Sequence, residues 1–272
     1  MRQGTHPQIK LLFILISFFA FGCKPIAPTY TKENFVPSIQ KICKEEFGIN
    51  DVKVWLIGET AWIYAPQNKL IDKDLKFDKK ITERINKVAL SVSRVLLSMK
   101  PRPKFYVIVA SDIKDLGADL INVGNVDDIV RYQFEFISRG EFGKRNVYDA
   151  YLSPSALSDT EGKHINPYDI KMEDFLSLQI VQRISLKFKE DRMEIKSLEC
   201  FFKDGTFNLQ YEKVDAEKNA NFNVNKEILK IVFLALKNYS FNDYSFVKIS
   251  NLESGERTIL GRNALEQDFS SN

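Results

Sequence analysis

The chain has 272 residues, of which 44% are hydrophobic and 28% charged, a composition typical of a folded globular protein rather than a disordered one. Its 39 basic and 36 acidic residues give a formal net charge of +3, which argues against a strongly basic surface for nucleic acid. The only histidines are His6 and His164, too few for a metal site built from several imidazoles.

The first 22 residues have the parts of a secretory signal. Residues 1–10 are polar and carry Arg2 and Lys10, and residues 11–21 read LLFILISFFAF. An apolar run of 11 residues is short for a membrane-spanning helix, which needs about 20. A basic start, an apolar stretch and a small residue, Gly22, therefore predict an exported protein.

The residues Ala20-Phe21-Gly22-Cys23 resemble the lipobox of bacterial lipoproteins. Gly22 and Cys23 match that pattern, whereas Ala20 and Phe21 depart from it. The resemblance implies removal of residues 1–22, diacylglyceryl and palmitate-type acylation of Cys23, and a mature domain outside the cytoplasm in the cell envelope. An ordinary signal peptide and an uncleaved N-terminal anchor are the alternatives.

Residues 23–33 contain two prolines and predict a tether between the lipidated cysteine and a folded region, residues 34–272. The pattern next predicts a helix from Asn34 that ends at Gly48. We then expect two strands joined by a turn, a long amphipathic helix ended by prolines, and a central apolar strand; these are 52–56, 60–64, 81–99 and 105–110.

The second half has a less regular pattern, with a candidate subdomain break near 113–126. We expect helices at 125–137, 172–188 and 224–236 and strands at 145–151, 197–202, 206–211, 244–249 and 257–260. We also expect a turn framed by Gly140 and Gly143 and an exposed loop at 153–171. The order predicts an α+β fold, with helices packed against small, mainly antiparallel sheets. No internal repeat is evident in the sequence.

His164 is the one histidine that would remain after cleavage, and it lies in the expected loop. A Ser-His-Asp triad would have to use it together with Ser155, Ser158, Asp159 or Asp169, but no GxSxG elbow is present. A loop histidine with ordinary hydrogen bonds is therefore the favoured interpretation. The phosphate-binding motifs GxxxxGK[ST] and GxGxxG are absent from the sequence, and we expect no cofactor and no metal.

The cysteines and the acidic pairs also have interpretations that require no active site. Cys43 and Cys200 could form a disulfide, but two separate buried thiols are the favoured interpretation. The acidic pair Asp127-Asp128 is expected near a helix end, where carboxylates favour the helix dipole or face solvent.

One segment stands out as a candidate ligand or partner site. Residues 131–151 read RYQFEFISRGEFGKRNVYDAY and combine four cations, Arg131, Arg139, Lys144 and Arg145, with interleaved aromatic residues. Such a mixture can bind anions or carbohydrate, or form a protein hot spot. The alternative, which we favour, is that the aromatics belong to the core and the cations to a solvated rim.

These features predict a membrane-anchored envelope lipoprotein whose mature part is a non-catalytic binding or assembly module. Its expected partners are the membrane, through the lipid, and an envelope protein, with no nucleic acid. A surface-anchored hydrolase acting through the 153–171 loop and a small-ligand binding protein are the alternatives.

Overall fold

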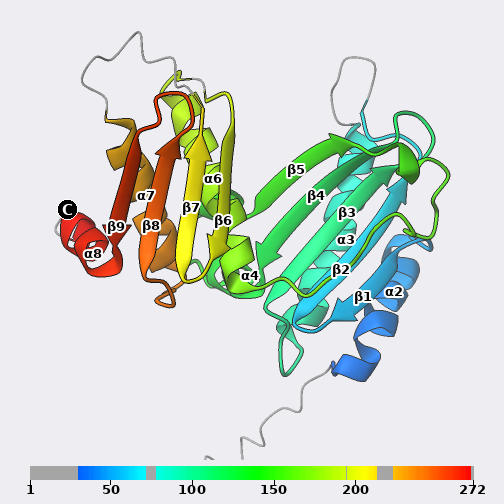
Figure 1. The fold of residues 1–272 in the computed structure, drawn as a ribbon. Coiled ribbons are helices and arrows are strands. Elements are labelled where there is room, and N and C mark those ends of the chain that lie inside the picture. Colours follow the sequence, from blue (N-terminus) through cyan, green and yellow to red (C-terminus); the bar gives the residue numbers. More distant parts are fainter. Residues whose placement is uncertain (1–29, 72–77, 194, 213–222, 271–272) are drawn as a thin grey trace, which may run out of the picture.

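The protein folds around two β-sheets that lie side by side, each with helices packed behind it (Figure 1). The computed structural model describes residues 30–71, 78–193, 195–212 and 223–270. Five of the seven strand pairings within these residues are antiparallel, so the predicted α+β class is confirmed. The predicted signal segment and Cys23 lie outside the described residues.

The first sheet belongs to residues 30–152, which we call the N-terminal module. Its elements in chain order are α2 (Lys32–Phe47), β1 (Lys53–Ile57), β2 (Thr60–Gln67), α3 (Lys79–Leu97), β3 (Phe105–Asp112), β4 (Ala118–Asn125), α4 (Val126–Gln133), α5 (Arg139–Arg145) and β5 (Val147–Leu152). The strands follow one another in the order β1-β2-β3-β4-β5, with only β2 and β3 parallel.

Helix α3 illustrates how the sequence dictates this module. Asp78 caps its first turn by accepting a hydrogen bond from the Lys80 N–H (2.7 Å), which satisfies one of the free donors at a helix start. Its apolar stripe, centred on Val88, Val92 and Val95, is buried against α2 and one face of the sheet. Strand β3, predicted to be central, is buried along its whole length.

The second sheet belongs to residues 172–270, the C-terminal module. Its elements are α6 (Met172–Glu190), β6 (Leu198–Lys203), β7 (Thr206–Tyr211), α7 (Val224–Asn238), β8 (Phe246–Asn251), β9 (Arg257–Gly261) and α8 (Arg262–Ser270). The strand order is β6-β7-β8-β9, with β7 and β8 parallel. Helices α6 and α7 bury their apolar sides on one face of this sheet.

The two modules repeat one topology, although the sequence shows no repeat. Residues 32–133 and 172–270 each run helix, hairpin, helix, hairpin, helix, and α5 and β5 are additional to the first repeat. The register of the parallel pair starts from Thr60↔Phe105 in one and Thr206↔Phe246 in the other. Backbone bonds recur as well: the Phe105 N–H donates to Glu59 O (3.1 Å), and the Phe246 N–H donates to Gly205 O (3.3 Å). The last helix of each repeat starts directly after its hairpin.

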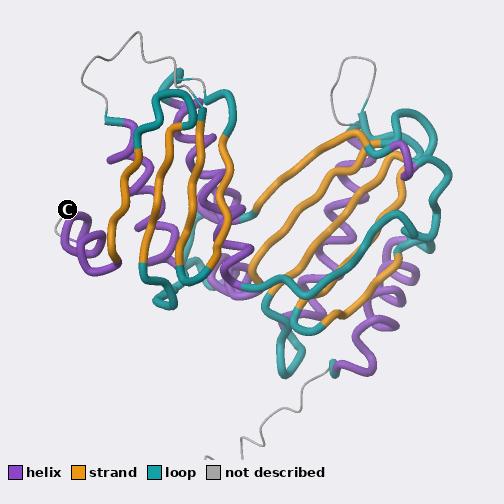
Figure 2. Tube along the Cα trace, viewed as in Figure 1, coloured by secondary structure: helices purple, strands orange, loops and turns teal. Residues whose placement is uncertain are grey.

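The modules differ in what covers the second face of each sheet. Residues 153–171, which we call the strap, cross the front of the first sheet (Figure 2). Apart from a short 3-10 turn, η1 (Pro154–Ala156), the strap has no regular structure, as predicted. Its Ile170 joins Trp62 and Tyr64 in a second core on that face. In the second sheet, exposed and half-buried residues alternate along β6, and Phe246 of β8 is 48% exposed.

Several expected boundaries need correction. The division between the sheets falls at the strap, not near 113–126, because β3 and β4 form one hairpin of the first sheet. Residues 139–145 are helix α5 rather than a turn, since Ser138 caps them by accepting from the Glu141 N–H (3.1 Å). Strand β4 and helix α8 were not predicted, and the first described helix begins at Lys32 rather than Asn34.

The two cysteines of the described residues lie in different modules and are both free. Cys43 is part of the first core, and Cys200 packs against the core of the second sheet. Burial raises the pKa of both thiols, that of Cys200 to about 12, so both stay protonated at neutral pH. The interpretation as separate thiols is confirmed. Among the described helices, none is both long enough and apolar enough to cross a bilayer.

Candidate functional site

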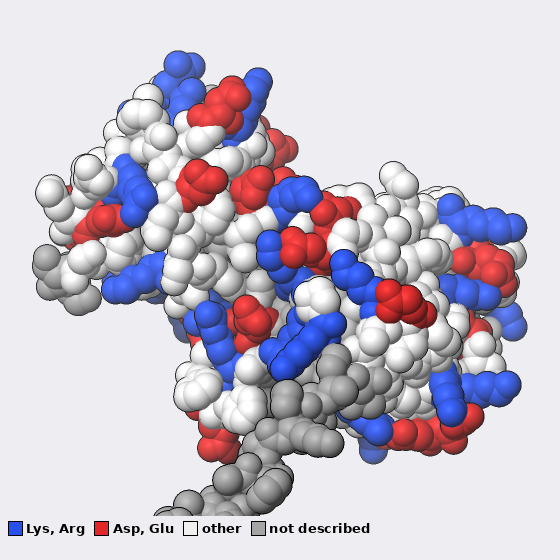
Figure 3. All heavy atoms as spheres, turned by 90° about the horizontal axis from the view of Figure 1, so that it is seen from below, with Lys and Arg blue, Asp and Glu red and all other residues white. Residues whose placement is uncertain are grey.

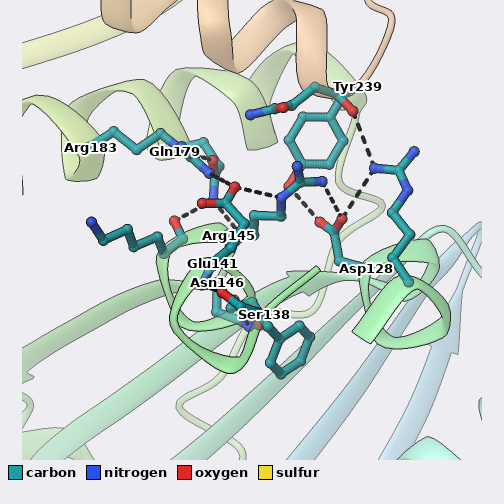
Figure 4. Close-up of polar contacts among 12 residues, drawn as sticks. Asp128, Ser138, Glu141, Arg145, Asn146, Gln179, Arg183 and Tyr239 are labelled. Carbon is teal, nitrogen blue, oxygen red and sulfur yellow. Dashed lines mark hydrogen bonds and ion pairs between the residues drawn. The ribbon is translucent and has the colours of Figure 1, made fainter. Parts of the chain in front are cut away.

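A network of buried polar side chains joins the two modules, and its centre is Asp128 (Figure 4). Asp128 lies in the first turn of α4, which Asn125 caps by accepting from the Asp127 N–H (2.9 Å). Its Oδ1 accepts from Arg145 (2.9 Å) and its Oδ2 from the Tyr239 hydroxyl (2.5 Å). Tyr239 follows α7 at the end of that helix, so this carboxylate has partners from both modules.

Arg145 is the cation of the network and is itself buried. Besides Asp128, its guanidinium donates to Glu141 (2.8 Å) and lies over the ring of Tyr239, 5.7 Å from the centroid. Glu141 in turn accepts from Arg183 of α6 (3.1 Å). Buried charges are tolerated when each is paired and hydrogen-bonded, and this network meets that condition.

Helix α6 completes the junction by covering one end of the open edge of the first sheet. Gln179, fully buried, donates to the Arg145 carbonyl, and Gln182 donates to the Asn146 carbonyl. The Gln182 side-chain oxygen accepts from the Tyr148 N–H of β5 (2.7 Å). These side chains satisfy backbone groups that an edge strand would otherwise expose, so the junction also protects β5.

The pKa values of the network follow from this pairing. Burial disfavours the charge on Arg145, yet its bonds to Glu141 and Asp128 outweigh burial and raise its pKa. Burial and the neighbouring Asp128 carboxylate raise the pKa of Tyr239. Burial would raise the pKa of Glu141, but the Arg145 and Arg183 guanidinium groups lower it. At neutral pH Arg145 is therefore cationic, Glu141 anionic and Tyr239 a neutral hydroxyl.

The four cations predicted as a patch are separated by this arrangement. Arg145 is internal, and Arg131 binds Asp128 (3.3 Å) and the Asn238 carbonyl (3.1 Å). Lys144 pairs with Glu190 (3.6 Å) on the surface. Arg139 is exposed at the start of α5. The structure thus assigns two of the four to the junction between modules.

The aromatic residues of the same segment lie mainly outside, contrary to the favoured interpretation. Phe134 and Phe136 are 69% and 77% exposed. Tyr148 and Tyr151 on β5 are exposed as well, and Tyr132 stacks on Phe142 at a centroid distance of 4.8 Å. The favoured interpretation is therefore wrong for this segment: the cation Arg145 is buried, and most of the aromatic side chains are exposed to solvent.

His164 is held within the strap between two carboxylates. Its Nδ1 lies 2.5 Å from Asp159 Oδ2, its Nε2 lies 3.2 Å from Asp119 Oδ1, and its side chain is 5% exposed. Burial raises the pKa of Asp159, but hydrogen bonds from the His164 ring and nearby backbone N–H groups lower it well below the usual range. Both ring nitrogens contact carboxylates, and through Asp119 of β4 His164 connects the strap to the first sheet.

Ser155 and Asp169, also considered for a triad, have other partners. Ser155 lies 3.3 Å from the Ser153 hydroxyl, and Asp169 accepts from the Glu59 N–H (2.8 Å). Ser111 donates to Asp119, one of the two carboxylates that contact His164. Within the described ranges no serine bonds to His164, so the three groups of a triad do not meet there.

Metal-binding geometry is not evident in the described residues, and one face of the molecule carries charges of both signs. No group of three or more His, Cys, Asp or Glu is placed there to hold a metal ion. On the face seen from below, acidic and basic side chains are intermingled over both modules (Figure 3). Comparison of the chain with protein-family models, curated proteins and solved structures finds no match. Function must therefore be inferred from its own residues.

Removing the buried guanidinium should destabilise the protein far more than removing its exposed neighbour. Arg145→Ala leaves Asp128 buried without its buried cationic partner, and we expect a loss of about 3–5 kcal/mol. Arg131→Ala is the matched control, because Arg131 contacts the same carboxylate but is 38% exposed; about 0–1 kcal/mol is expected. Urea unfolding followed by circular dichroism measures both, and equal losses would contradict the proposed role of Arg145.

The contribution of Asp159 should disappear in acid. Its pKa is lowered in the folded protein, so its stabilisation is complete above the usual aspartate pKa of about 3.9 and is lost as pH falls below it. Asp159→Asn should therefore be less stable than the unmodified protein at pH 7, with a difference that shrinks from about pH 5 to pH 3. Urea titrations followed by tryptophan fluorescence provide the test, and a difference independent of pH would refute it.

Proposed function

We propose that the chain is a lipid-anchored envelope protein whose folded part is a non-catalytic binding or assembly module. The observation that carries the proposal is the cysteine placed directly after an apolar run and Gly22. In this proposal, two or three acyl chains hold the protein, since one chain alone binds a membrane only marginally.

The engagement of the reactive groups supports a binding role over a hydrolase. Acyl transfer needs a nucleophile within reach of its base and an open space for substrate. His164 instead has both nitrogens on carboxylates and is nearly enclosed. The exposed aromatic rings of residues 132–151 are the kind of surface that binding proteins use.

A small-ligand binding protein is the second candidate, and one surface groove favours it. Helices α5, α6 and α7 enclose an open groove of about 320 Å³ whose apolar floor includes Leu186, Ile231 and Leu234. Charged residues of both signs, among them Lys144, Glu190 and Lys230, line its rim. This volume is at the lower end for a small-molecule site, so the groove ranks below the aromatic surface.

The anchor can be tested by changing Cys23. Cys23→Ala should abolish acylation, and the protein should leave the membrane fraction or accumulate unprocessed, because no thiol remains at the cleavage site. Cys200→Ala is the matched control and should stay membrane-bound. Fractionation of expressing bacterial cells, with intact mass of the membrane form, gives the measurement. Unchanged mass and membrane association of Cys23→Ala would overturn the proposal.

A further inference from the structure

Among the described residues, the most exposed aromatic side chains lie together in a turn between α4 and α5. We call residues 134–136 the aromatic tip. Its two rings, Phe134 and Phe136, have centroids 6.4 Å apart and are 69% and 77% exposed. Single exposed apolar residues are normal in soluble proteins, but two neighbouring phenylalanines at this exposure suggest a contact surface.

The shape of the tip is fixed by the end of α4. The Phe136 N–H donates to the Arg131 carbonyl (2.8 Å) and the Glu135 N–H to the Tyr132 carbonyl (3.1 Å), the pattern of a Schellman helix end. Glu135 takes the left-handed position of that motif, with φ 59°, where glycine is usual. In most such ends the residue in the place of Phe136 packs back on its helix; here it faces solvent.

The base of the tip is rigid because it belongs to the junction between modules. Arg131 is bound to Asp128 and to the Asn238 carbonyl, and Tyr132 is stacked on Phe142. The rings are therefore presented at a fixed place relative to both modules, which lowers the entropy lost when a surface of this kind binds.

The tip lies within reach of the membrane if the chain is anchored at Cys23. Seven residue steps separate Cys23 from Tyr30, which span at most about 24 Å. Tyr30 pairs with Met99, just after the end of α3. Lys104 follows Met99 by five residues, and its carbonyl accepts from the Val126 N–H at the start of α4 (2.9 Å). Helix α4 adds about 12 Å between that point and the tip.

We propose that the aromatic tip inserts into the lipid–water interface of the membrane to which Cys23 is anchored. The inference rests on the proposed lipid anchor and deepens it by giving the folded region a second membrane contact. Phenylalanine is among the side chains that proteins bury at the boundary between lipid headgroups and acyl chains. The carboxylate of Glu135, between the two rings, limits insertion to headgroup depth.

Quenching by brominated lipid tests the contact directly. The full-length protein, purified from bacterial membranes, is reconstituted into phosphatidylcholine vesicles with brominated or ordinary acyl chains, carrying Phe136→Trp. Phe246→Trp is the matched control: Phe246 is also exposed, on the open face of the second sheet, which points away from the helices (Figure 1). Trp55 and Trp62 are accounted for by subtracting the unmodified protein.

The added fluorescence of Phe136→Trp should fall at least twofold in brominated vesicles, and that of Phe246→Trp should change by less than a tenth. Intact mass of the same samples reports acylation of Cys23. An acylated protein in which position 136 is quenched no more than position 246 overturns the membrane contact alone and favours a protein partner for the tip. A protein without acyl groups overturns the proposed anchor and, with it, this inference.

Discussion

The buried carboxylate of Asp128 is the constraint on which the arrangement of the two modules depends. An unpaired charge in a protein interior is destabilising by several kcal/mol, so Asp128 requires partners, and they come from both sides: Arg145 from the N-terminal module and Tyr239 from the C-terminal module. Satisfying this one group brings the end of α7 onto α4. The glutamines of α6 then bind the carbonyls around Arg145 and close the junction.

Coverage by the strap, which only the first sheet has, accounts for the different residues of the two repeats. With Thr60 and Thr206 in equivalent places, the shared register aligns Trp62 with Asn208 and Val107 with Lys248. The first member of each pair lies under the strap, and the second faces the uncovered side of the second sheet. Because one face is covered in only one module, equivalent positions differ in hydrophobicity, and the repeat could not be recognised from the amino acids alone.

Local patterns were sufficient to predict much of the fold. The apolar stripe of α3 and the continuous apolar run of β3 were identified because periodicity is a property of neighbouring residues. The roles of Asp128 and His164 could not be predicted, since their partners Tyr239 and Asp119 lie 111 and 45 positions away. The aromatic tip was missed for a different reason: aromatic residues usually pack in a core, and nothing local marks Phe134 and Phe136 as exposed.

A protein tied together in this way is expected to move as one body, so that a lipid at Cys23 and a contact at the tip would orient both modules at once. Differential scanning calorimetry of the unmodified protein tests this coupling most directly. One transition, with a calorimetric enthalpy equal to the van't Hoff enthalpy, is predicted because the modules unfold together. Two separate transitions, or a van't Hoff enthalpy near half the calorimetric value, would show that the Asp128 network does not join the modules, and would contradict the account.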